Sequence, residues 1–161
     1  MAIPGFVQSA AASWSSYYGN HQLVSVTIKY LHIAATMIGG GLAISLDRQL
    51  FKARRASDGR AFVLQQMHGS HRTVVPALAV ASLTGVLMMG ADLDTFLASK
   101  LFWLKIGVVV ALVANGVALQ MFEQSAHQHD AAWPRLSIVS VISITLWLIT
   151  AFVGTLLTVA A

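Results

Sequence analysis

Lys29 and His32 are the residues best suited to chemistry, because they lie inside an otherwise apolar stretch from Leu23 to Leu46. Ionisable groups within a membrane span are costly, so they usually face other helices or a cavity and mark functional sites. Three residues apart on a helix, the two side chains share one face. Lys105, near the start of a later apolar stretch, supplies a second cation. An imidazole can ligate a haem iron and ammonium groups can bind its propionates, so these residues predict a tetrapyrrole site.

Each candidate in this predicted cofactor site also has a structural alternative. The stems of Lys29 and Lys105 are long enough for their ammonium groups to reach the lipid headgroups. His32 is too short for that, but a neutral imidazole can hydrogen-bond a neighbouring helix, with Asn115 or Ser82 as its partner. Asn115 is itself a fourth cofactor-binding candidate, and an interhelical hydrogen bond is its own alternative.

For a haem b at this site, the sequence identifies one axial ligand, His32. His21 lies roughly 16 Å further out along the same helix, at about 1.5 Å per residue. His71 lies just before the next, antiparallel span and is expected at a different depth. The second axial ligand is therefore left unassigned.

A second set of candidates lies on the other side of the predicted membrane. His68 and His71 precede the second span, and His127 and His129 follow the third. Together with the carboxylates of Glu123 and Asp130, they are ligands of the kind that bind zinc, copper or iron, and the histidines could also ligate a second haem. Spacings such as H-x-H constrain geometry little, so solvated surface histidines are the alternative.

Four apolar stretches would position these residues: Leu23–Leu46, Val74–Leu93, Leu101–Phe122 and Leu136–Val159. Each has about the 20 apolar residues that a helix needs to cross ~30 Å of hydrocarbon. The composition agrees, since 10% of residues are charged, against about 25% in soluble domains. We predict an all-α, up-down four-helix transmembrane bundle in which residues 1–161 form a single domain, with a short segment, 1–22, before the first span.

The distribution of charge predicts an orientation in the membrane. The connection between the first two spans is rich in basic residues: Arg48, Lys52, Arg54, Arg55, Arg60 and Arg72. The next connection carries Asp92 and Asp94 before Lys100. The positive-inside rule then places the basic connection in the cytoplasm and both termini outside, as in a bacterial inner-membrane protein. The net charge of +4 is explained in this way, without nucleic-acid binding.

Two further features of the sequence bear on the possible chemistry and on the segment before the first span. The chain has no cysteine, which excludes disulfides, thiolate metal ligands and thiol redox chemistry. Trp14, Tyr17 and Tyr18 lie in an uncharged segment before the first span. Such aromatic side chains can anchor a short helix at the outer membrane interface.

The first predicted span resembles the first core helix of the HemJ-type protoporphyrinogen oxidases, through Lys29-x-x-His32, the glycines that follow and Arg48. Pro76 and Gly85 are similar to the proline and glycine of that family's next helix. The start of the third span, Phe102-Trp103-Leu104-Lys105, resembles the Trp/Lys start of the family's third helix, a pattern shared with CopD-type copper-resistance membrane proteins.

This resemblance covers residues 29 to 116 and implies a haem-binding or tetrapyrrole-handling four-helix core, with His32 and Lys105 carried over. Two positions depart from the pattern. Asn115-Gly116 stands where such proteins often have a histidine, and Trp133-Pro134-Arg135 replaces an Asn-Glu-x-Pro stretch. The resemblance therefore implies the fold and a b-type haem rather than protoporphyrinogen oxidation.

These observations predict a b-type haem-binding membrane protein that transfers electrons or handles tetrapyrroles, with a quinone or a tetrapyrrole as its membrane-soluble partner. One alternative is a non-catalytic accessory subunit, packed through glycine-rich faces on other membrane subunits or on copies of itself. Another is a metal-handling protein that uses the histidines of the second set. No nucleophile–base pair is visible, so catalytic residues are not assigned; an enzymatic activity would be that of an oxidoreductase.

Overall fold

The computed structural model describes residues 5–53, 59–126, 129 and 132–160. In these ranges the chain forms six helices: α1 (Gly5–Asn20), α2 (Gln22–Ala53), α3 (Arg60–Ala91), α4 (Leu93–Ala98), α5 (Lys100–Ala126) and α6 (Trp133–Ala160). Four of them, α2, α3, α5 and α6, are long and apolar enough to cross a membrane. The predicted all-α membrane bundle with four spans is thus confirmed.

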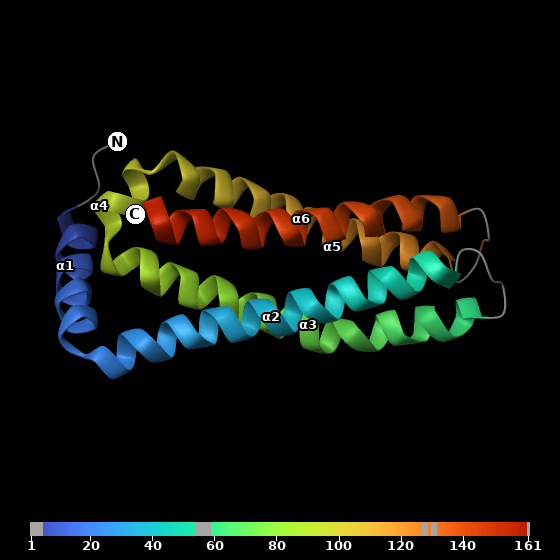
Figure 1. The fold of residues 1–161 in the computed structure, drawn as a ribbon, viewed down its shortest axis with the longest axis horizontal. Coiled ribbons are helices and arrows are strands. Elements are labelled where there is room, and N and C mark those ends of the chain that lie inside the picture. The colour runs from blue at the N-terminus through green and yellow to red at the C-terminus, as the bar shows by residue number, and fades with distance from the viewer. Residues whose placement is uncertain (1–4, 54–58, 127–128, 130–131, 161) are drawn as a thin grey trace.

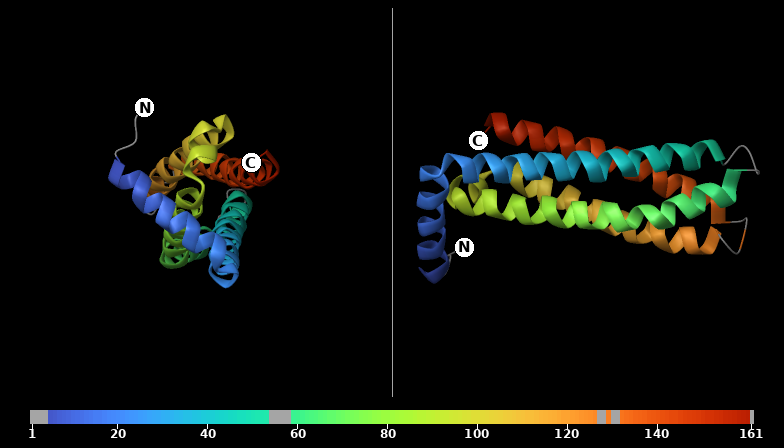
Figure 2. Two further views of the ribbon diagram at one scale, coloured as in Figure 1. Left: turned by 90° about the vertical axis from the view of Figure 1, so that its left-hand side faces the viewer. Right: turned by 90° about the horizontal axis from the view of Figure 1, so that it is seen from below.

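The four long helices run side by side, and α1 lies across one end of them (Figure 1). Helices α2 and α3 form one antiparallel hairpin and α5 and α6 form another, as Figure 2 also shows. The two hairpins meet mainly where α2 packs on α6. We call the end next to α1 and α4 the α1 end, and the opposite end, where α2 stops and α3 starts, the basic end.

The helices extend beyond the predicted spans at the basic end. Helix α2 continues past Leu46 to Ala53, and α3 begins at Arg60, well before Val74. Arg48, Lys52, Arg60 and Arg72, which we assigned to a connection, therefore lie in helices, while Arg54 and Arg55 lie outside the described residues. Arginine, lysine and glutamine are good helix formers, so a helix can leave the apolar layer without ending.

The basic end also contains the principal buried cluster among the described residues. All four long helices contribute to it, and the side chains of Leu50 and Leu136 are completely buried. The cluster consists of Leu50, Ala53, Val63, Leu64, Met67, Leu119, Ala126, Ala132, Trp133 and Leu136. By contrast, many large apolar side chains along the bundle are exposed, as expected for helices in contact with lipid.

Halfway along the bundle, two adjacent glycines of α2 receive side chains from different neighbours. A Cβ on Gly39 would lie 3.2 Å from the Cβ of Ala77 in α3. A Cβ on Gly40 would lie only 2.8 Å from Cε3 of Trp147 in α6. Gly41, the next residue, has nothing within 4 Å. The missing side chain of Gly40 thus makes room for the indole ring of Trp147.

Gly40→Ala should destabilise the bundle by about 1–3 kcal/mol, because the new methyl group would collide with a ring that fills its space. Gly41→Ala is the matched control. It adds the same methyl group where nothing is in contact, so it should be neutral or slightly stabilising through helix propensity. Thermal unfolding of both variants in detergent measures the difference. Equal stability of the two would show that the contact with Trp147 is not tight.

Helix α1 confirms the prediction of a short helix before the first span, and Trp14 joins that helix to α3. Its Nε1 donates to the backbone oxygen of Leu87 in α3 at 2.7 Å. The indole also lies beside Gly90, where a Cβ would be 3.3 Å from its Cδ1. Tyr17 stacks on His21, with ring centroids 4.1 Å apart. Through these two contacts, Trp14 fastens α1 to the end of α3.

Candidate functional site

The imidazole of His32 lies between α2 and α3 in the half of the bundle nearer the α1 end. Its Nδ1 lies 2.8 Å from the backbone oxygen of Ala81 and 3.1 Å from Oγ1 of Thr84. Because a carbonyl oxygen only accepts, Nδ1 must carry the proton and donate. Thr84 is buried and uses its own hydroxyl hydrogen toward the backbone of α3. The structural alternative for His32, a bond to a neighbouring helix, is therefore present, with partners other than Asn115 and Ser82.

This hydrogen bond leaves the other ring nitrogen of His32 with a lone pair. No hydrogen bond to Nε2 occurs in the part of the chain that the structure describes. Gly85 lies beside the ring, and a Cβ there would be 3.4 Å from Cε1 of His32. Metal-binding histidines commonly donate one ring N–H to a backbone carbonyl, which fixes the tautomer and presents the other nitrogen to the metal. The imidazole is thus held in the form that can ligate iron.

Lys105 of α5 is close enough to His32 for its charge to act on the imidazole. Its side chain is half-buried, and its Nζ would lie 3.4 Å from a Cβ built on Gly154 of α6. Lys105 and Gly154 are at similar distances from the ends of their helices at the α1 end. The stem therefore extends sideways across the bundle, and snorkelling does not describe Lys105. Lys29 is exposed.

The Lys105 ammonium has no carboxylate partner among the described residues, where the ion pairs both belong to Glu123. Charged groups within a membrane span are normally paired. All four long helices contribute to this region: His32 from α2, Gly85 from α3, Lys105 from α5 and Gly154 from α6. The arrangement combines a ring nitrogen of a kind that can ligate a metal with a cation that has no anionic partner among the described residues.

Asn115 makes an interhelical hydrogen bond, which the sequence analysis gave as the alternative to cofactor binding. Its Nδ2 donates to the backbone oxygen of Val139 at 3.2 Å and joins α5 to α6. It lies nearer the middle of α5 than Lys105. The structure shows no contact between Asn115 and His32 in the described residues.

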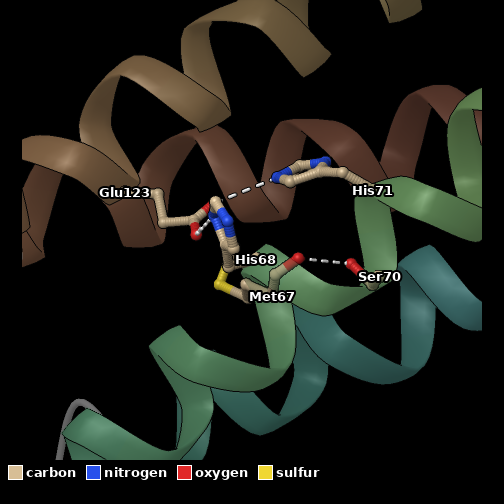
Figure 3. A network of polar contacts seen from close by, with 5 residues as sticks. All are labelled: Met67, His68, Ser70, His71 and Glu123. Atoms are coloured by element: carbon tan, nitrogen blue, oxygen red, sulfur yellow. Dashed lines mark hydrogen bonds and ion pairs between the residues drawn. The ribbon is translucent and has the colours of Figure 1, made fainter.

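At the basic end, two of the predicted histidines converge on one carboxylate, as Figure 3 shows. Nε2 of His71 in α3 donates to Oε2 of Glu123 in α5 at 3.0 Å. Nδ1 of His68 lies 3.9 Å from Oε1 of the same carboxylate. Glu123 is 3% exposed, whereas His68 is 87% exposed. Glu123, which we placed after the third span, is therefore a buried residue of α5 that fastens α3 to α5.

The predicted metal site at this end is only partly visible. His127 and Asp130 lie outside the described residues, and His129 is exposed. Within the ranges that the structure describes, no group of three or more histidine and acidic side chains could hold a metal ion. His68, His71 and His129 as metal ligands thus stay a prediction.

Asp47 was missed in the sequence analysis, where it was passed over beside Arg48 at the end of a span. The structure buries it against α6, with its Oδ1 accepting from Oγ of Ser140 at 2.8 Å. A periodic signal was present, because Gly40, Asp47 and Leu50 are spaced seven and three residues apart. Such positions share a helix face, and that face packs inward here.

Two surface cavities, of about 350 and about 380 Å³, lie at the basic end on α2 and α5, and His32 lines neither.

Comparison with known proteins found no match to this chain among family models, curated proteins or solved structures. The resemblance to HemJ-type and CopD-type proteins thus depends only on the residues quoted for it.

Proposed function

We propose that this protein binds haem b in the bacterial inner membrane, with His32 as the iron ligand supplied by this chain. The observation that carries the proposal is that His32 Nε2 is free of hydrogen bonds and the Lys105 ammonium is without a carboxylate partner among the described residues, with the two side chains close together. A ligand that fits both groups has a metal at its centre and a carboxylate at its edge, and haem meets both requirements.

Each residue of the site has a distinct task in this proposal. Ala81 and Thr84 hold the imidazole in one tautomer and one orientation. Lys105 binds a propionate, and Lys29, exposed on the same helix as His32, is available for the second. Haem, when bound, supplies one-electron redox chemistry. The electron partners we propose are a membrane-soluble quinone or tetrapyrrole and a second protein.

The absorbance spectrum of the purified, full-length protein tests the proposal. We expect a Soret band, an α band that appears on reduction with dithionite, and one haem per chain. His21→Ala is the control, because it changes an exposed histidine outside the His32 site and should leave the spectrum intact. A colourless protein with no metal after haem-supplemented expression would contradict the proposal and favour an accessory subunit. Bound metal without haem would favour a metal-handling protein.

The proposed orientation places the basic end in the cytoplasm and the α1 end outside. Most basic side chains lie at one end of α2 and α3, and the positive-inside rule supports this direction. A reporter fused after Arg55 should report a cytoplasmic position, and one fused after Asp94 an external position. The reverse pattern would place His32 and Lys105 in the inner half of the membrane and overturn this orientation.

A further inference from the structure

A carboxylic acid lies buried between α2 and α6, away from His32 and Lys105. Asp47 of α2 is 3% exposed, and the two serines of α6 next to it, Ser140 and Ser143, are also buried. Oγ of Ser140 donates to Oδ1 of Asp47 at 2.8 Å and lies 3.2 Å from the Asp47 backbone oxygen. Oδ2 is fully enclosed and has no hydrogen-bond partner. The hydroxyl of Ser143 is also next to the carboxyl group.

No counter-ion for Asp47 is present among the described residues. The charged and titratable groups of the surrounding helices are engaged or exposed elsewhere. The guanidinium of Arg60 in α3 lies over the Trp133 ring, 4.9 Å from its centroid. His68 and His71 are directed to Glu123. The remaining groups are exposed: Arg48 and Lys52 of α2, Arg72 of α3 and Arg135 of α6.

A lone carboxylate in such surroundings is energetically unfavourable, and a buried acid normally becomes neutral by taking up a proton. The geometry also fits the neutral form. A carboxylic acid has one acceptor oxygen and one O–H donor, and the two serine hydroxyls offer one donor and one acceptor. Ser140 already donates to Oδ1, and in the neutral form the Ser143 hydroxyl can accept from the other oxygen.

We infer that Asp47 is a proton-binding site: its Oδ2 carries a proton and donates it to Oγ of Ser143, while Oδ1 accepts from Ser140. The proton joins α2 to α6 near the basic end. Loss of the proton would leave a negative charge at this contact, beside which the described residues place no cation. The inference stands on the Asp47 contacts alone and does not depend on haem binding.

Infrared spectroscopy of the full-length protein in lipid tests the protonation state directly. At neutral pH the wild type should show the C=O stretching band of a protonated carboxyl group, and Asp47→Asn should lose it. Asp94→Asn, which changes an exposed aspartate in the same way, should retain it. Ser143→Ala should shift the band, because a hydrogen bond from the acid is removed, without abolishing it. Identical spectra for wild type and Asp47→Asn would overturn the inference.

Thermal unfolding supplies an independent measurement. Asparagine has the shape of the neutral acid, so Asp47→Asn should unfold at the same temperature as the wild type at neutral pH. As pH rises, the folded acid must give up its proton, so the wild type should lose stability relative to Asp47→Asn. A marked loss of stability of Asp47→Asn at neutral pH would contradict a neutral acid. Stabilisation of the wild type alone by sodium, compared with choline, would assign a metal cation in place of the proton.

Discussion

His32→Ala should leave the purified protein without bound haem. The substitution removes the proposed iron ligand, while the helices around it should keep their packing. Removing a group that merely orients a metal ligand typically lowers affinity about 10–100-fold. Thr84→Val, which deletes an acceptor of the His32 Nδ1–H, should fall in that range, and His32→Ala should exceed it. Haem titration of the apo-protein, followed by the Soret band, measures both.

Chemical rescue by imidazole distinguishes a role of His32 as iron ligand from a purely structural role. His32→Gly leaves a space of imidazole size, so added imidazole should restore the Soret band if the ring serves as a ligand. Lys105→Met keeps the length of the stem and removes the charge, so it should weaken haem binding without removing the axial ligand. An unchanged spectrum in His32→Ala would mean that His32 acts only through the hydrogen bond that joins α2 to α3.

His71→Ala should cost about 3 kcal/mol of stability, because it deprives a buried carboxyl group of its closest partner. Glu123 is 3% exposed, and its remaining neighbour, His68, is 3.9 Å away and almost fully solvated. An ordinary interhelical hydrogen bond in a membrane is worth about 0.6 kcal/mol. Asn115→Ala, which removes one such bond between α5 and α6, is therefore the comparison. Unfolding midpoints in detergent should fall much further for His71→Ala.

A double-mutant cycle identifies the source of this cost. If the penalty comes from an unpartnered Glu123, adding Glu123→Leu to His71→Ala should recover much of the lost stability. Equal and additive losses for the two single variants would show that the residues act independently, against the 3.0 Å contact that joins them.

The sequence was sufficient for the number and type of spans, because each apolar stretch has the length that hydrocarbon thickness requires. It did not give their ends. Between Leu46 and Gly59 there is no proline or glycine to stop α2, and charged residues such as Arg48 and Lys52 do not interrupt a helix. The windows of apolar residues mark the segments expected in the hydrocarbon layer, whereas the helices extend beyond these windows.

The candidate site was only partly predictable for a related reason. His32 and Lys105 stood out because their types are unusual in a span. Their partners depend on how each helix is rotated and shifted against its neighbours, which residue type does not encode. Thus Thr84 and the carbonyl of Ala81, not Asn115, hold the imidazole. Asp47 was missed because a charged residue beside Arg48 is ordinarily solvated.

The position of the buried cluster has a mechanical consequence. Leu50, Met67, Leu119 and Leu136 bring the two hairpins together at the basic end, far from His32. If the hairpins stay joined at the basic end, their separation by a given angle moves the helix ends furthest at the α1 end. Local opening requires least free energy where few buried contacts must break. Under the proposed function, we therefore expect a flat, rigid molecule dissolved in the bilayer to enter sideways near His32 while the bundle stays assembled at its far end.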